Sequence, residues 1–220
     1  MVTKTSPETR KRAPLSRRRI LDAALRYIDA HGIDGLSMNK LGAELDVKGM
    51  SLYNHVTNKD DILDGVVELL WSEIEGAAPA GAEWREGFRS VARAIRGVAH
   101  RHPRATPLIV SQQVMPEPAL RLVQAHIAAA TEAGIPTGQV YPLLRTITSY
   151  ALGAAFAELS WTTGQVGCAP AVSDLLRPGI PDDLARIAEV FCGESDHDQA
   201  FELGLDLMLR GVDCQTTEHR

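Results

Sequence analysis

The stretch KGMSLYNHVTNKDD, residues 48–61, carries two apolar residues, Leu52 and Val56, at the i,i+4 spacing of one helix face. The same stretch is rich in side chains that form hydrogen bonds: Lys48, Ser51, Tyr53, Asn54, His55 and Lys59. A helix buried in a core has little use for so many donors, because each buried polar group needs a partner. The pattern therefore predicts a short helix that packs through its two apolar residues and offers its polar side chains to another molecule.

Two helices are expected before this stretch. The first begins after the N-cap candidate Ser16 and runs to about His31, with Gly32 just beyond its end. A second, short helix follows Ser37. Because only a short turn separates the second helix from the third, the two must cross at a steep angle, as in a helix-turn-helix. We therefore expect a three-helix domain of this type at residues 16–60.

Positive charge gathers in the same part of the chain. Residues 1–60 hold eleven Lys or Arg and seven Asp or Glu, a net charge of +4, whereas residues 61–220 have a net charge of −9. Residues 1–15 contain two prolines and show no periodicity, so we expect them to form a flexible basic arm. This asymmetry favours contact between the first part of the chain and a polyanion.

Three arginines, Arg17, Arg18 and Arg19, occupy the first turn of the first predicted helix. They lie at the positive end of the helix dipole, which costs stability unless an external anion is bound there. The alternative interpretation is three solvated side chains.

Residues 61–220 show helical periodicity, with no strand pattern and no internal repeat, so the predicted fold class is all-α. Thr57 and Asp60 have the spacing of a capping box that begins a helix. The Gly, Ala and Pro residues of GAAPAGAE, residues 76–83, mark an internal boundary. Further helices are expected at about 84–102, 118–133, 137–163, 181–191 and 199–212, with a short segment at 107–114. We interpret one row on the helix at 84–102 as a solvated face: Arg85, Arg89, Arg93 and Arg96.

Composition is that of an ordinary globular protein, with 220 residues of which 45% are hydrophobic. No stretch approaches the roughly 18 apolar residues of a membrane span. The basic N-terminus lacks the apolar segment of a secretory signal, so we expect a cytoplasmic protein without membrane contact. Cys168, Cys192 and Cys214 form no C-x-x-C pair. Reduced structural thiols are therefore favoured over a redox sensor.

The sequence ILDAALRYIDAHGIDGLSMNKLGAELDVKGMSLYNHVTNKDDILDGV, residues 20–66, resembles the DNA-binding domain of TetR-family transcriptional repressors. The match runs without a gap through a first helix, a glycine, LGAELDV, SLYNHV and NKDDIL. The resemblance implies a DNA-binding transcriptional regulator. It would repress transcription from a palindromic double-stranded operator and be released by a small-molecule effector, and no cofactor is implied.

Three later segments resemble the regulatory domain of tetracycline repressors: AEWREGF at 82–88, residues 137–159 of the long helix, and AFELGLDLMLRGVD at 200–213. The resemblance implies that residues 61–220 form a ligand-binding and dimerisation domain. It also implies a homodimer that forms through residues 137–163 and 199–212.

One feature of tetracycline repressors is missing from this sequence. Those proteins bind a magnesium–drug chelate through a histidine in the segment after the family's fifth helix. Here that segment reads HPRATPLIVSQQV, with no histidine after His102, and Glu75 stands where the family has a histidine that contacts the drug. These departures argue against magnesium–tetracycline as the effector, and no metal site is expected.

DNA contacts are implied position by position for the second and third helices and the turn between them. With the arginines of the first turn, the candidate residues are Arg17, Arg18, Met38, Asn39, Lys40, Lys48, Gly49, Met50, Ser51, Tyr53, Asn54, His55 and Lys59. A recognition helix enters the major groove with its N-terminus first, so its early residues face bases and the flanking residues face phosphates. Leu52 and Val56 are expected to be core residues without DNA contacts.

An apolar pocket between the helices of the regulatory domain is expected to bind the effector. Its candidate lining residues are Trp84, Phe88, Ile95, Thr106, Gln113, Met115 and Phe156. For each of them, plain packing in the core is an equally good interpretation. The sequence HRH, residues 100–102, has the spacing of neither one helix face nor a zinc site, so metal binding there is not favoured.

Two other classes of protein remain open. An enzyme would need a nucleophile with its base, or paired acids, and no such constellation is found. An all-helical interaction protein that has lost DNA binding is disfavoured by the arginines of the first turn and by the polar residues of 48–59.

Overall fold

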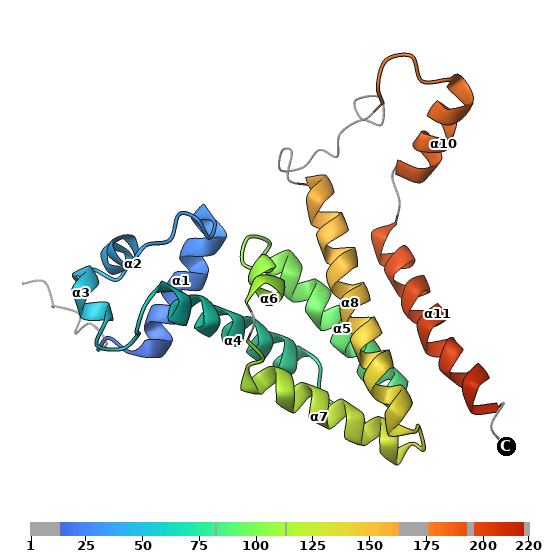
Figure 1. Ribbon diagram of the computed structural model, residues 1–220, viewed down its shortest axis with the longest axis horizontal. Coiled ribbons are helices and arrows are strands. Elements are labelled where there is room, and N and C mark those ends of the chain that lie inside the picture. Colours follow the sequence, from blue (N-terminus) through green and yellow to red (C-terminus); the bar gives the residue numbers. More distant parts are fainter. Residues whose placement is uncertain (1–13, 82, 113, 163–175, 193–195, 218–220) are drawn as a thin grey trace, which may run out of the picture. The chain divides into compact units, whose positions relative to one another are not determined.

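The computed structural model describes residues 14–81, 83–112, 114–162, 176–192 and 196–217 (Figure 1). These residues form α-helices joined by turns and loops, and none of them lies in a strand. The helices are α1 (Arg17–His31), α2 (Met38–Glu44), α3 (Gly49–Leu52), α4 (Lys59–Ala77), α5 (Trp84–Arg101), α6 (Pro107–Ser111), α7 (Glu117–Glu132), α8 (Thr137–Thr162), α10 (Asp182–Cys192) and α11 (His197–Thr217). The all-α prediction is confirmed.

The chain packs as two compact units, residues 1–66 and 67–220. The division falls inside α4, whose first residues pack in the first unit and whose last residues pack in the second. A functional boundary after residue 60 remains a prediction.

Helix α1 begins and ends where its sequence predicts. The Ser16 hydroxyl accepts a hydrogen bond from the backbone N–H of Arg19 at 3.3 Å, and so caps the first turn. At the other end Gly32 has a φ of 80°, a conformation that glycine adopts without steric cost. Ile20, Ala24 and Ile28 on the inner face are fully buried.

The backbones of α2 and α3 approach each other closely. A Cβ atom on Gly42 would lie 2.8 Å from the Gly49 backbone nitrogen and 2.9 Å from the Val47 carbonyl oxygen, so no other residue fits at position 42 without a backbone shift. The turn itself is closed by hydrogen bonds from Val47 N to Gly42 O at 2.8 Å and from Asp46 N to Ala43 O at 3.1 Å. Asp46 adopts a left-handed conformation with a φ of 56°.

Helix α4 begins one residue later than its predicted capping box implies. Asn58, rather than Thr57, caps the helix: its side-chain Oδ1 accepts from the Asp61 backbone N–H at 2.8 Å. The Asp61 carboxylate in turn accepts from the Thr57 N–H at 2.7 Å. The predicted pair of Thr57 and Asp60 was therefore wrong by one position: the capping side chain is Asn58, and the carboxylate three residues later is Asp61.

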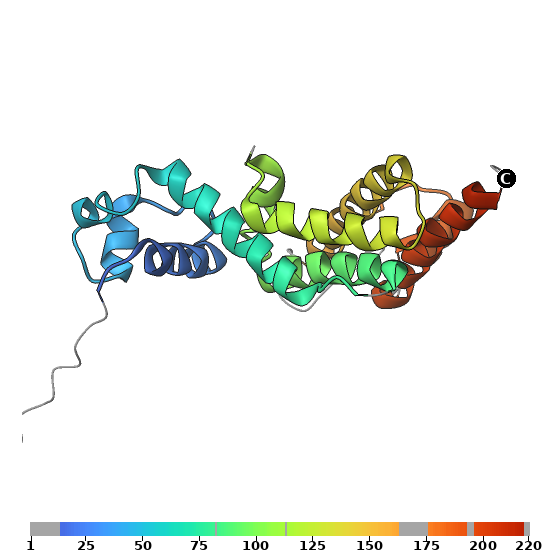
Figure 2. The same ribbon diagram turned by 90° about the horizontal axis from the view of Figure 1, so that it is seen from below.

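In the second unit, helices α5, α7 and α8 contact one another, and α11 contacts α8 (Figures 1 and 2). Their shared core is apolar and includes Phe88, Val91 and Ile95 of α5, Ile147 of α8 and Leu205 of α11. Tyr150 of α8 stacks on Phe201 of α11 with ring centroids 5.4 Å apart. Its hydroxyl donates to the Phe201 carbonyl oxygen at 3.1 Å.

The arginine row of α5 is not the solvated face that its sequence suggested. Arg93 pairs with Glu202 of α11 through two hydrogen bonds of 2.7 and 2.8 Å. Arg89 pairs with Asp206, also on α11, and Arg96 bonds to Glu158 of α8 at 2.9 Å. These pairs, which we call the arginine seam, attach α5 to α8 and α11. The hydrogen bond from Arg93 lowers the pKa of Glu202 below its usual value. Arg85, the remaining member of the row, instead lies over the Trp84 ring at 4.5 Å.

One ion pair joins the starts of α1 and α4, because the Arg17 Nη2 donates to Asp61 Oδ1 at 2.7 Å. This bond, followed by the bond from the Thr57 N–H, lowers the pKa of Asp61 from 3.8. A carboxyl group with a lowered folded-state pKa stabilises the protein above its unfolded pKa, and that contribution is lost as the pH falls through the folded value.

Replacement of Arg17 by Gln should therefore lower the free energy of unfolding by about 0.5–1 kcal/mol at pH 7, as for a partly exposed pair. The loss should shrink as the pH falls below about 4 and Asp61 becomes protonated. Urea unfolding followed by circular dichroism at pH 7 and pH 3 measures both values. Arg18→Gln, which removes the exposed pair with Asp22, is the matched control and should change little. An equal loss for Arg17→Gln at both pH values would contradict the assignment.

Candidate DNA-binding interface

The polar side chains predicted to meet DNA lie on the surface of α2, α3 and the segment just after α3. Leu52 and Val56 point inward and are 0% and 3% exposed, so the expectation that they belong to the core is confirmed. The exposed candidates are Asn39, Lys40, Lys48, Met50, Tyr53, Asn54 and His55, and the half-buried ones are Met38, Gly49, Ser51 and Lys59. Met50 is 76% exposed and Tyr53 is 47% exposed.

Helix α3 itself is short and ends at Leu52. Tyr53, Asn54 and His55 follow it in a turn, in which the His55 N–H donates to the Leu52 carbonyl oxygen at 2.9 Å. The Val56 N–H donates to the same Leu52 carbonyl oxygen at 3.1 Å, and the Val56 side chain returns to the core. The turn therefore leaves three consecutive polar side chains on the outside.

Several of the predicted cationic residues already contact atoms of the first unit. Lys40 Nζ donates to the Gly35 carbonyl oxygen at 3.0 Å, and Lys59 Nζ donates to the Ile33 carbonyl oxygen at 3.4 Å. A neutral carbonyl holds the ammonium group in place without cancelling its charge, so both lysines keep a positive charge that can meet a phosphate. Arg17 differs, because its partner Asp61 is a carboxylate.

The predicted effector residues differ in their burial. Trp84, Phe88, Ile95 and Thr106 are buried. The Trp84 and Phe88 rings meet edge to face at 5.5 Å, and the Thr106 hydroxyl donates to the His102 carbonyl oxygen at 2.8 Å. Phe156 is half-buried and Met115 is 62% exposed. Gln113 lies outside the described residues.

A buried histidine that the sequence did not single out lies beside these residues. His126 of α7 is 2% exposed. Its Nδ1 lies 2.8 Å from the Leu122 carbonyl oxygen and must donate to it, which leaves Nε2 as the atom that can meet another group. Nε2 is buried and has no hydrogen-bond partner among the described residues. The ring lies 6.3 Å from the Phe88 ring and against Gly87.

Gly87 also lines a cavity of about 250 Å³, together with Pro79, Gly81, Glu83, Glu86 and Ser90.

The sequence did contain a signal for His126. It stands four residues after buried Leu122 and four before buried Ala130, on the apolar stripe of α7 where a polar residue is out of place.

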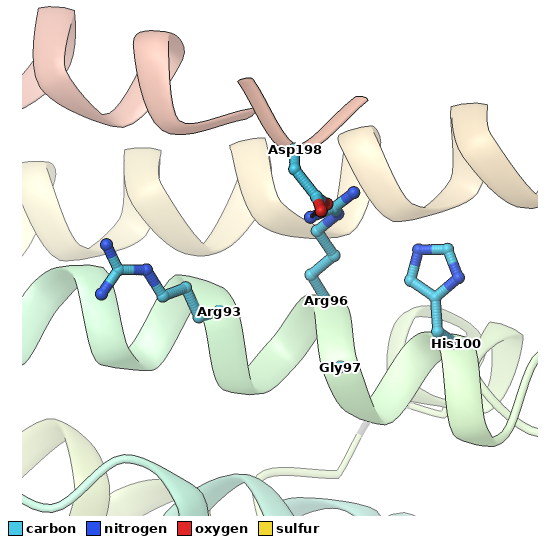
Figure 3. A pocket seen from close by; sticks show the side chains of 5 residues that line it. All are labelled: Arg93, Arg96, Gly97, His100 and Asp198. Carbon is cyan, nitrogen blue, oxygen red and sulfur yellow. Dashed lines mark hydrogen bonds and ion pairs between the residues drawn. The ribbon is translucent and has the colours of Figure 1, made fainter. Parts of the chain in front are cut away.

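A second cavity of about 320 Å³ is polar and is lined by Arg93, Arg96, Gly97, His100 and Asp198 (Figure 3). Arg96 reaches toward Asp198, with Nη1 and Oδ1 2.6 Å apart. The His100 Nε2 lies 2.6 Å from the buried carboxylate of Glu158, which also accepts from Arg96. The cavity therefore belongs to the arginine seam, where acids already pair with its arginines.

The two histidines of HRH, His100 and His102, face different acids and do not come together as metal ligands. His100 faces Glu158, whereas His102 lies 3.3 Å from Glu73. Among the described residues, no group of three or more His, Cys, Asp or Glu is placed to hold a metal ion.

Glu75, which stands where tetracycline repressors have a drug-contacting histidine, is engaged by Arg121 of α7. Two hydrogen bonds of 2.8 Å join the guanidinium and carboxylate groups. This contact lowers the pKa of Glu75. On the same helix, Glu73 pairs with Arg101 at 2.9 Å. The end of α4 is thereby attached to α5 and α7.

Two family models cover most of the chain. Residues 20–66 match the model described as bacterial regulatory proteins, tetR family, and residues 77–216 match that of the tetracyclin repressor-like C-terminal domain. No helix among the described residues is long and apolar enough to cross a membrane.

Individual relatives extend over nearly the whole chain. The chain is 29% identical to the class D tetracycline repressor protein of Escherichia coli over 93% of this chain and 92% of the relative. It is 27% identical to an HTH-type transcriptional regulator of Saccharopolyspora erythraea, over 93% and 87% of the two chains.

Among solved structures, the TetR-family protein ActR of Streptomyces coelicolor, in complex with actinorhodin, is similar with a TM-score of 0.74 and 25% identity. That match covers 92% of this chain and 99% of the other. The fold, the exposed polar face of α2 and α3, and both family models indicate the same family of DNA-binding proteins. The chain belongs to the TetR family and is a DNA-binding transcriptional regulator of the effector-responsive repressor type, with a helix-turn-helix domain followed by a ligand-binding domain.

Proposed function

We propose that this repressor binds a palindromic operator as a homodimer, through the outer face of α2, the turn after it and α3. The observation that carries the proposal is the division of one short segment into a buried pair, Leu52 and Val56, and a set of exposed polar side chains around them. The proposed contacts come from Arg17, Arg18, Met38, Asn39, Lys40, Lys48, Gly49, Met50, Ser51, Tyr53, Asn54, His55 and Lys59.

The proposed roles follow from exposure and chemistry. Met50, largely exposed and apolar, suits a thymine methyl group in the major groove. Tyr53, His55, Lys48 and Lys59 suit phosphate oxygens, which account for most hydrogen bonds in such interfaces. Lys59 keeps its charge while its ammonium group is held by the Ile33 carbonyl, which favours a fixed phosphate contact.

Tyr53→Ala should weaken operator binding roughly ten-fold or more, because a hydrogen bond to a charged phosphate is lost. Fluorescence anisotropy at fixed salt, with a duplex from the region upstream of the protein's own coding sequence, measures the dissociation constant. Tyr53→Phe keeps the ring and should show nearly the same loss. Circular dichroism should show unchanged helical content for both. Equal binding by Tyr53→Ala and wild type would refute the phosphate role of this residue.

The second copy of the chain is proposed to pack on α8 and α11. Along α8, the exposed residues Ser149, Gly153 and Ala157 are small and spaced four apart, which allows another helix to come close. Along α11, Leu203 and Leu207 are 59% and 64% exposed on one face. A surface that combines small residues with exposed leucines is typical of an interface that a partner covers.

Leu207→Glu should convert the dimer to a monomer, because a charge would be buried without a partner in the centre of the interface. Light scattering after size-exclusion chromatography gives the mass, and operator affinity should fall with it because half-sites are bound together. Leu120→Glu on α7, whose leucine is 54% exposed, is the matched control and should remain dimeric. A dimeric Leu207→Glu variant would exclude this interface.

The effector is proposed to bind beside His126. Its Nε2 is a buried acceptor without a partner among the described residues, so a ligand that carries a hydroxyl or other donor would satisfy it. The aromatic rings of Trp84 and Phe88 close by favour an aromatic ligand. The full proposed set adds Ile95, Thr106, Gln113, Met115 and Phe156. The complex of ActR with actinorhodin supports an effector site in this fold.

His126→Phe should abolish the release of operator by an active hydroxylated aromatic compound, because the ring loses its acceptor. His126→Gln keeps an acceptor and should retain a measurable response. Operator release is followed by anisotropy across a panel of such compounds that includes actinorhodin, and each variant's operator affinity without compound should match wild type. Full release of His126→Phe by the compounds that release wild type would overturn the proposed contact.

A further inference from the structure

We propose that Asp61 is a positioning residue for DNA binding, although its charge has the same sign as that of DNA. Its carboxylate holds the start of α1 and the turn after α3 in one arrangement, so that an acid strengthens operator binding. This inference rests on the proposed binding of DNA by the first unit. It goes further because Asp61 is not among the proposed contacts and would itself be repelled by phosphates.

The two oxygens of the Asp61 carboxylate bind two different parts of the first unit. Oδ1 accepts a hydrogen bond of 2.7 Å from Arg17 Nη2, at the start of α1. Oδ2 accepts a hydrogen bond of 2.7 Å from the Thr57 backbone N–H. Arg17 and Asp61 are 44 positions apart in the chain, so this side chain is a bridge between segments that the sequence separates.

The bridging carboxylate is itself held in place. The Asp61 backbone N–H donates to the Asn58 side-chain Oδ1 at 2.8 Å, which fixes the first turn of α4. The Asp61 side chain is 24% exposed, and the bonds from Arg17 and Thr57 lower its pKa below the usual value. Asp61 is therefore ionised at neutral pH, and the bridge is present under the conditions in which DNA would bind.

Both segments that Asp61 holds carry proposed DNA contacts. Arg17 is one of them, and Thr57 directly follows residues 53–56, the first three of which are exposed. An arginine carries several N–H donors, and the Arg17 side chain is 42% exposed, so it can meet a phosphate while Asp61 orients it. An arginine held in this way loses less side-chain entropy on binding than one that is free to move.

The neighbouring acid separates this role from that of simple charge. Asp60 also lies in the first turn of α4, and it is exposed. Replacement of either acid by asparagine removes one negative charge from the same helix end, so the two variants change the attraction to DNA and the helix dipole alike. Only Asp61→Asn also breaks the bridge, because a carboxamide has one acceptor oxygen where the carboxylate has two.

The test measures operator affinity and its salt dependence for the full chain, by fluorescence anisotropy with a duplex from the region upstream of the protein's own coding sequence. Asp60→Asn should bind as wild type does, or up to about two-fold more tightly, because a repulsive charge is lost. Asp61→Asn should bind roughly five-fold more weakly, because the phosphate contact of Arg17 and the placement of residues 53–56 are both lost. The slope of log affinity against log salt should fall in magnitude by about one for Asp61→Asn and stay near the wild-type value for Asp60→Asn.

Arg17→Gln tests the link between Asp61 and Arg17. It removes one arm of the bridge and leaves the cap of α4 in place, so it should also lower the magnitude of the salt slope by about one. In the double variant Arg17→Gln with Asp61→Asn, the slope should fall no further, because both changes remove the same phosphate contact. A variant that merely unfolds in part would lose active protein without a change of slope, and circular dichroism measures the folded fraction.

Tighter binding by both Asp60→Asn and Asp61→Asn would overturn the inference while the DNA function stands, because the acid would then act only by its charge. An unchanged salt slope for Asp61→Asn, or a further fall in the double variant, would also overturn it, because Asp61 would not act through Arg17. If wild type binds no DNA, the proposed function fails and the inference fails with it. If Asp61→Asn does not fold, Arg17→Gln decides: a slope lower by about one supports the inference, and an unchanged slope overturns it.

Discussion

The DNA-binding unit depends on the contact between the backbones of α2 and α3 at Gly42 and Gly49. A side chain at position 42 would hold the helices apart, since an added Cβ would lie 2.8 Å from the Gly49 backbone nitrogen and 2.9 Å from the Val47 carbonyl oxygen. The close crossing lets Leu52 and Val56 reach the core while the turn stays short. The exposed polar residues take their places from this crossing, so the surface proposed to face DNA is set by backbone packing and not by the polar residues themselves. Local hydrogen bonds around Asp46 then close the turn.

Helix α4 is bound at both of its ends by pairs of carboxylates and arginines. At its start, Asp61 accepts from Arg17 and from the backbone of Thr57. Near its end, Glu75 forms two hydrogen bonds with Arg121 of α7. One continuous helix therefore carries an anchor in each unit. Since His126 also lies on α7, the proposed effector contact and this anchor share one element.

The sequence was most informative where structure is local. Ser16 caps its helix as predicted, because capping needs only atoms within three residues. The arginine seam could not be predicted, since Arg93 and Glu202 are 109 positions apart and each alone is typical of a solvated face. His126 was missed for a related reason. Its unpartnered nitrogen is a property of the fold around it, and only its place on an apolar stripe hinted at burial. Within the proposed DNA-binding surface, the residue types could be named, but the close approach of the backbones at Gly42 and Gly49 required the crossing geometry.

The arginine seam sorts charge by helix, with the cations on α5 and the acids on α8 and α11. These pairs fix the position of α11 along α5. If α11 moved by one helical turn, Glu202 would leave Arg93 and Asp206 would leave Arg89. The exposed leucines of α11 are thereby presented in a single register. In the proposed homodimer, the charges inside each subunit would therefore set the position of the leucines that meet the second copy.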